Sequence, residues 1–186
     1  IILALGIATL GLVTLPPILG SYRQFGILRR LRTTPVHPAR LLTAQLVVHG
    51  SVAIVSAALA VFGVASFFDV PLPQSPAWFL LAFVLAAASI FAIGLLAGAL
   101  VRTSVSGQAI GMAIYFPMLF FAGVWIPRSV MGDGLRLFSD LTPLGSAVQA
   151  LEDSWFGTTP SFMNLAVMAV YAVVAGAIAV RFFRWE

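Results

Sequence analysis

Five long runs without a single charged residue dominate this chain, at about 1–20, 41–67, 78–101, 108–126 and 161–180. About 20 apolar residues in a helix cross the roughly 30 Å hydrocarbon core of a bilayer. Backbone polar groups in lipid must be satisfied internally, and helices do this within one segment. The pattern therefore predicts an all-α polytopic membrane protein, with residues 1–186 forming one transmembrane domain.

The composition agrees with this prediction and excludes several functions. Hydrophobic residues make up 61% of the chain and charged residues 9%, whereas soluble domains carry roughly 25% charged residues. The formal net charge of +4 comes from arginines at the ends of apolar runs, so no nucleic-acid partner is expected. The sequence has no Cys and no Lys, so it contains no thiol chemistry and no phosphate-binding loop with its lysine. We expect no catalytic residues and no metal site.

The arginines divide unequally between the two sides of the membrane if the five runs alternate in direction. One side carries Arg23, Arg29, Arg30, Arg32, Arg40, Arg102, Arg181 and Arg184, and the other carries Arg128 and Arg136. Cytoplasmic loops are enriched in basic residues. We therefore expect the 21–40 loop and the C-terminus to be cytoplasmic. Residue 1 then lies near the outer face, and this predicts an earlier span, absent from the given sequence.

The loop after the first run predicts a short amphipathic helix over about 22–33. Phe25, Ile27, Leu28 and Leu31 fall on one helical face, at 100° per residue. Arg23, Arg29 and Arg30 fall opposite, and Pro35 ends the helix because the residue before a proline avoids helical angles. Such a helix either lies in the lipid interface or docks on a soluble partner, and residue physics alone leaves both open.

Two stretches resemble a known family. "GILRRLRTTPVHPARLLTAQL" (26–46) and "FAGVWIPRSVMGDGLRLFSDLTPLGSAVQAL" (121–151) are similar to segments of ABC type-2 permeases, especially the drug-resistance exporter branch. Members have six spans, so the chain resembles the last five, with the N-terminal part missing. Gln24 and Gln45 stand where that family often has Glu and Lys.

The resemblance implies a bacterial plasma-membrane exporter subunit for drugs, lipids or glycolipids. Two permease chains would pair, and separate ATPase subunits would bind ATP and Mg²⁺, so this chain would hold no cofactor itself. The coupling segment that docks on the ATPase would comprise Phe25, Gly26, Ile27, Leu28, Arg29, Arg30, Leu31, Arg32, Thr34 and Pro35. The first and fourth spans would line the substrate path between the subunits, at Gly107, Gly111, Tyr115 and Phe116.

Two other functions stay open. A secondary transporter would couple transport to an ion gradient, but such carriers usually hold charged residues within their spans, and these runs have none. His49 is the one histidine within the five runs, and histidine is the side chain that can exchange a proton near neutral pH. We expect it to pack and hydrogen-bond to a neighbouring helix, with pore lining as the alternative. A structural or sensor membrane protein would bind no ATPase.

Packing signals complete the predictions. Gly94 and Gly98, and Gly107 and Gly111, form two G-x-x-x-G motifs, which let membrane helices approach closely. We expect the first pair to pack within the chain. Pro16-Pro17 predicts a hinge or a static kink in the first span. Residues 127–160 form an outer cap of short helices, whose 144–155 helix lies in the outer interface or dips back into it.

Overall fold

The computed structural model describes residues 1–28, 38–68 and 70–182. The described residues contain helices and connecting turns and no strand. The elements are α1 (Ile2–Ala8), η1 (Thr9–Thr14), α2 (Leu15–Gln24), α4 (Pro38–Phe68), α5 (Pro76–Leu100), α6 (Ser104–Phe121), η2 (Arg128–Val130), α7 (Asp133–Leu141), α8 (Pro143–Trp155) and α9 (Phe162–Phe182). Five apolar stretches in this part of the chain are long enough to span a membrane, which confirms the predicted fold class.

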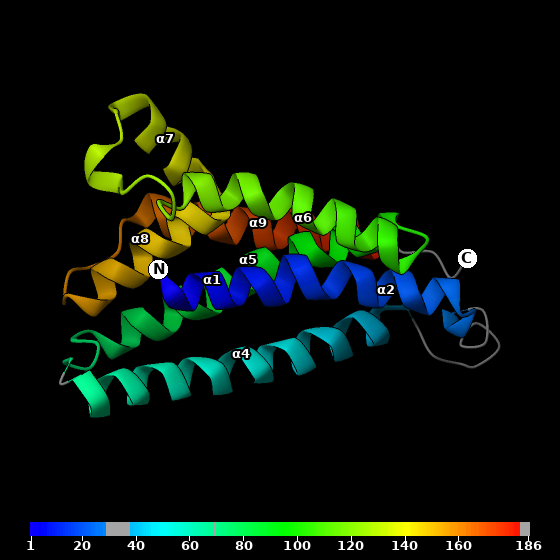
Figure 1. Cartoon of the computed structure of the whole chain (residues 1–186), viewed down its shortest axis with the longest axis horizontal. Coiled ribbons are helices and arrows are strands. Elements are labelled where there is room, and N and C mark those ends of the chain that lie inside the picture. The colour runs from blue at the N-terminus through cyan, green and yellow to red at the C-terminus, as the bar shows by residue number, and fades with distance from the viewer. Residues whose placement is uncertain (29–37, 69, 183–186) are drawn as a thin grey trace.

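Successive long segments run in opposite directions along the long axis of the molecule (Figure 1), and α1, η1 and α2 together form the first of them. Of the six described arginines, Arg23, Arg40, Arg102 and Arg181 lie at the end where α2 and α9 finish; we call this the arginine-rich end. The opposite end holds Asp133, Asp140, Glu152 and Asp153, beside Arg128 and Arg136. The predicted charge asymmetry is thus present in the folded chain.

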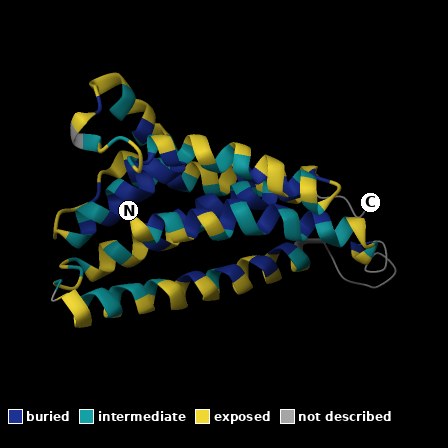
Figure 2. Cartoon of the chain, in the orientation of Figure 1, coloured by how far each residue is buried: buried dark blue, intermediate teal, exposed yellow. Residues whose placement is uncertain are grey.

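Helix α5 forms the centre of the bundle. It contacts the first span, α8 and α9, and small residues such as Ala82, Ala86 and Ala97 are buried along it. Figure 2 shows the buried residues concentrated along α5 and the first span. Small side chains let neighbouring membrane helices approach closely, so α5 can be surrounded on several sides.

The fourth span is shifted from its prediction at both ends. The helix α6 begins at Ser104, because Thr103 and Ser106 form a capping box that satisfies backbone N–H groups. It ends at Phe121, because Gly123 adopts a positive φ of 86°, a conformation that side chains other than glycine rarely adopt. The predicted end at residue 126 was therefore wrong, since the chain leaves the helix before Trp125.

The outer cap contains the predicted 144–155 helix, here α8. The Thr142 hydroxyl accepts a hydrogen bond from the Gly145 N–H at 3.2 Å, and Pro143 occupies the first turn, as the sequence predicted. Leu144, Val148 and Leu151 are buried and α8 packs on α5 and α9. The apolar stripe of α8 is thus part of the bundle core, while α7 projects from one end of the bundle in Figure 1 and still contacts α6, α8 and α9.

Candidate functional site at the arginine-rich end

The first span ends in a sharp turn where a continuous helix was predicted. Helix α2 stops at Gln24, and Gly26 adopts φ 67°, in the left-handed region where glycine carries no steric penalty. The prediction of one helix over 22–33 was therefore wrong. The pattern of apolar and basic residues does not reveal the break, because the break depends on the backbone conformation of the single residue Gly26.

The turn separates the apolar residues that were predicted to share one face. Phe25 is 69% exposed and Ile27 39% exposed, whereas Leu28 is 1% exposed and belongs to the hydrophobic core. Phe25 and Ile27 are thus available to a partner, and Leu28 anchors the segment to the bundle. The remaining predicted coupling residues, Arg29, Arg30, Leu31, Arg32, Thr34 and Pro35, lie outside the described residues.

Two polar side chains tie the end of α2 to the turn between α5 and α6. The Arg23 guanidinium donates from Nη1 to the Gly98 carbonyl oxygen at 3.1 Å and also to the Val101 carbonyl oxygen. The Gln24 side-chain oxygen accepts from the Ser104 N–H at 3.3 Å. The last carbonyls of α5 and a first-turn N–H of α6 have few partners within their own helices, so these bonds satisfy groups at both helix ends.

A third contact links α2 to α4 on the far side of the loop. The Gln45 amide donates to the Tyr22 hydroxyl at 3.0 Å, and Gln45 is buried. Gln24 and Gln45, the two positions that depart from the family's usual charges, therefore both make bonds between helices. The sequence analysis did not find these partners. The available signal was the presence of Tyr22, Arg23 and Gln24 together at the end of an apolar run, where polar groups need partners.

The middle of the first span contains a π-helical segment, η1, directly before Pro16-Pro17. The Leu12 carbonyl oxygen would accept from residue 16 in an α-helix and from residue 17 in a π-helix. Both residues are prolines, which have no N–H. Neither regular helical bond can therefore form at Leu12. Pro16-Pro17 thus coincides with a local change from π-helix to α-helix. Within η1, the Thr14 hydroxyl donates to the Thr9 carbonyl oxygen at 3.1 Å.

Glycines of the neighbouring helices α5 and α6 pack closely against the first span at this segment. A Cβ added at Gly111 would overlap the Leu12 carbonyl oxygen, and one added at Gly94 would overlap the Gly11 carbonyl oxygen. Such close approach brings Cα–H groups onto carbonyl oxygens, a weak favourable contact. The expected packing of the Gly94 motif within the chain is confirmed, because Gly98 also lies against the first span, where it meets the Leu19 side chain.

The four residues predicted to line a substrate path fall into two groups. Gly107 and Gly111 are buried against Pro16 and Leu12 of the first span, so they leave no free surface in this chain. The Tyr115 hydroxyl lies 3.1 Å from that of Thr9, and the Tyr115 ring meets the Phe116 ring edge-on at 5.9 Å. Phe116 is 55% exposed. Only Tyr115 and Phe116 therefore stay candidates for a path at the surface.

His49 is buried, and its Nδ1 lies 2.9 Å from the Gln45 carbonyl oxygen in its own helix. Its ring contacts Phe91 of α5 edge-on at 6.3 Å. The expected packing is confirmed, but the hydrogen bond stays within α4 and does not reach a neighbouring helix. Among the residues that the structure describes, no cluster of His, Asp or Glu could hold a metal ion.

These features define a multi-pass helical membrane protein whose helices make polar contacts at both ends of the bundle and whose inner spans pack through glycines. The chain belongs to the ABC-2 type transporter family, whose model matches residues 1–156. It is accordingly a membrane permease subunit of an ABC transporter. No curated protein and no solved structure matches it.

Proposed function

We propose that this chain is the membrane half of an ATP-driven exporter that moves an amphipathic or lipid-like substrate outward. Two copies, or this chain and a related permease, pair in the plasma membrane of a bacterium. Separate ABC-type ATPase subunits bind ATP and Mg²⁺ beneath them. The arginine-rich end faces the cytoplasm, because basic residues concentrate on that side of membrane proteins.

The observation that carries this proposal is the arrangement around Phe25. Phe25 and Ile27 expose apolar surface beyond the last turn of α2, where a protein partner could bury it. The residues just before them are bonded to the ends of α5 and α6 through Arg23 and Gln24. A displacement of the loop by a partner would therefore be passed directly to these helices, which is what ATP-driven coupling requires.

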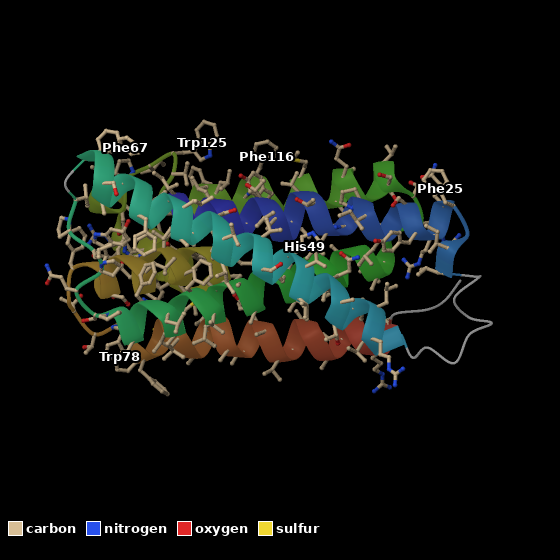
Figure 3. The ribbon with its side chains drawn as sticks, turned by 90° about the horizontal axis from the view of Figure 1, so that it is seen from below. Phe25, His49, Phe67, Trp78, Phe116 and Trp125 are labelled. Atoms are coloured by element: carbon tan, nitrogen blue, oxygen red, sulfur yellow. The ribbon has the colours of Figure 1, made fainter. Side chains whose placement is uncertain are left out.

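The test compares two exposed phenylalanines at opposite ends of the molecule (Figure 3). Phe25→Asp places a carboxylate in the proposed contact, and Phe67→Asp changes a side chain that is 85% exposed at the other end of α4. An apolar anchor at an interface is worth about 2 kcal/mol or more. We expect Phe25→Asp to reduce co-purification of a co-expressed ABC-type ATPase by at least tenfold, and Phe67→Asp to leave it unchanged. Equal retention by both variants would place the coupling contact elsewhere.

The substrate path is proposed to run along η1 and α6, beside the exposed Thr9 and Phe116 and the half-buried Tyr115. The Thr9 hydroxyl donates to the Leu5 carbonyl oxygen and lies next to the Tyr115 hydroxyl. A hydroxyl oxygen can accept further hydrogen bonds, so this pair offers acceptor sites to a facing chain or a substrate. The chain has no Cys, so single cysteines report cleanly. We expect Phe116→Cys to cross-link two copies in the membrane and Phe62→Cys, exposed on α4, to give no cross-link. The reverse result would move the subunit contact to α4.

The energy source for transport distinguishes the proposed ATP-driven exporter from a secondary transporter, which uses an ion gradient, and from a structural or sensor protein, which does not transport. We expect transport in vesicles to require the ATPase subunit and ATP, and to continue when the proton gradient is collapsed. Transport by the permease alone after a pH step would support the secondary carrier. Absence of any ATPase partner together with absence of transport would support the structural reading.

A further inference from the structure

An apolar groove of about 500 Å³ lies between α4, α5 and α9, away from η1 and α6. Its rims are exposed side chains, Leu46 and Ile54 on α4, Val84 on α5 and Val180 on α9, and its floor includes the buried Phe91. Its volume falls within the roughly 300–1,000 Å³ of small-molecule sites. The groove therefore opens sideways, towards the space that the bilayer occupies around a multi-pass protein.

The groove covers only one half of the membrane thickness. On α4 its lining begins at Leu42 and ends at Ile54, which at 1.5 Å per residue corresponds to about 18 Å. Half of the hydrocarbon core is about 15 Å. A helix that crosses the whole membrane has about 20 residues. Such a helix would contact this groove along only half of its length. The extent of the groove matches one leaflet and thus one lipid chain.

The polar residue that lines the groove and the arginines that flank it lie at one of its ends. Thr43, the one lining residue with a hydroxyl among the described ones, is near the start of α4. Arg40 precedes the lining residues of α4, Arg181 directly follows Val180, and both arginines are exposed. Arginines at span ends extend their side chains to the headgroup level. Two helix ends that flank one end of the groove therefore supply positive charge where a phosphate would lie.

We propose that this groove binds one anionic phospholipid of the surrounding bilayer. Its acyl chain lies along α5 between α4 and α9, and its headgroup phosphate pairs with Arg40 and Arg181. Small residues make room for the chain, since a Cβ at Gly176 would meet only Ala92, at 3.9 Å. The lipid fills the space between α4 and α9 and holds α4 against the bundle. This site is separate from the proposed substrate path and does not depend on it.

The test measures lipids retained by the full permease in native mass spectrometry, after incubation with dioleoylphosphatidylglycerol or dioleoylphosphatidylcholine. We expect one phosphatidylglycerol per chain at a concentration where phosphatidylcholine retention is about tenfold lower. The attraction between one surface arginine and an anionic lipid corresponds to roughly a fivefold change in affinity for that lipid. The double variant Arg40→Gln/Arg181→Gln should bind both lipids equally, and Arg102→Gln, at the same end but outside the groove, should behave as wild type. Equal retention of both lipids by the wild type would overturn the headgroup pairing.

A second pair of variants tests the groove itself. Gly176→Leu fills it and should reduce retention of both lipids at least tenfold, whereas Gly63→Leu, whose Cβ position on α4 is open, should not. If Gly176→Leu does not fold, Ala88→Leu fills the same groove from α5. Unchanged retention in a folded groove-filling variant would overturn the proposal. So would displacement of the lipid by glycerol phosphate, or cross-linking of two copies through Gly176→Cys, which would assign the groove to a second chain.

Discussion

Helices α4 and α5 have nearly the same sequence character and opposite surroundings. Their most apolar 18-residue windows have mean hydropathies of 2.2 and 2.7, but 6% of the α4 window is buried in the chain against 50% of the α5 window. Buried residues on α4 form a single stripe of Leu42, Gln45, His49 and Ala53. Hydropathy measures preference for leaving water, and lipid and protein satisfy that preference equally.

The glycines of α4 and α5 differ in their surroundings in the same way as the two helices do. A Cβ at Gly94 of α5 would overlap backbone, whereas one at Gly50 or Gly63 of α4 would meet nothing within 4 Å. Small residues therefore permit close packing without requiring it. What distinguishes α5 is the four-residue spacing of Gly94 and Gly98, which places both on one face against the first span.

The largest effect is expected for a branched side chain at the centre of α5. Gly94→Val would push the first span away from α5, because the obstacle is the Gly11 backbone and not a flexible side chain. Overpacking of this kind costs about 3 kcal/mol or more, so we expect little folded protein by size-exclusion chromatography in detergent. Gly63→Val is the matched control and should keep the wild-type thermal midpoint. Two identical midpoints would mean that α5 is not the packed centre.

The second prediction concerns the single stripe of α4. Leu42→Ala removes a buried side chain and should lower the free energy of unfolding by about 2 kcal/mol, the low end for such truncations, because few neighbours contact α4. Leu59→Ala changes a side chain that is 71% exposed and should stay within about 0.5 kcal/mol. Thermal unfolding of both variants in the same detergent measures the difference. A larger loss for Leu59→Ala would show that the outer face of α4 has partners within one chain.

The third prediction isolates the hydrogen bond between α4 and α2. Tyr22→Phe removes the hydroxyl that accepts from Gln45 and should cost about 0.6 kcal/mol, as such bonds average in membrane proteins. A double-mutant cycle with Gln45→Leu gives the pairwise term. A coupling energy of zero would mean that α4 is held by its apolar stripe alone.

The smallest effect should have the opposite sign. Gly63→Ala on α4 adds a methyl group into open space and removes backbone freedom from the unfolded chain, which stabilises by about 0.5 kcal/mol. Gly111→Ala on α6 would meet the Leu12 carbonyl oxygen and should destabilise the protein. A small rise in the thermal midpoint for the first variant and a fall for the second are the expected results. Equal changes in both would argue that helix propensity, and not packing, decides their stability.

The sequence predicted the spans well because length and hydropathy are summed over some 20 residues, so single positions matter little. It failed where one residue decides the path of the chain. Gly26 and Gly123 end helices through positive φ angles, which composition does not reveal. A helix that packs in the core and a helix that lies on a membrane surface carry the same kind of apolar stripe. The packing of α8 on α5 could therefore not be predicted from the stripe of α8 alone.

The candidate site was predicted in part for the same reason. The apolar pattern at 25–28 could not separate the exposed Phe25 from the buried Leu28 without the turn at Gly26. The partners of Arg23 and Gln24 lie some 75 to 80 residues away in sequence. Such long-range pairs follow from the packing of the first span on α5 and α6, and no local pattern encodes them.

The wide turn at η1 also sets the phase of the first span. Buried residues there repeat every four positions, at Ala4, Ala8, Leu12, Pro16 and Gly20. In a regular α-helix each step of four residues rotates the buried stripe by about 40°, so it would drift around the helix along the span. A π-helical turn holds more residues and corrects part of this drift. If residues 9–14 instead formed a regular α-helix with the same number of residues, everything after them would be rotated about the helix axis relative to the part before them. Arg23 and Gln24 would then face away from the turn between α5 and α6 without any change in their own identity.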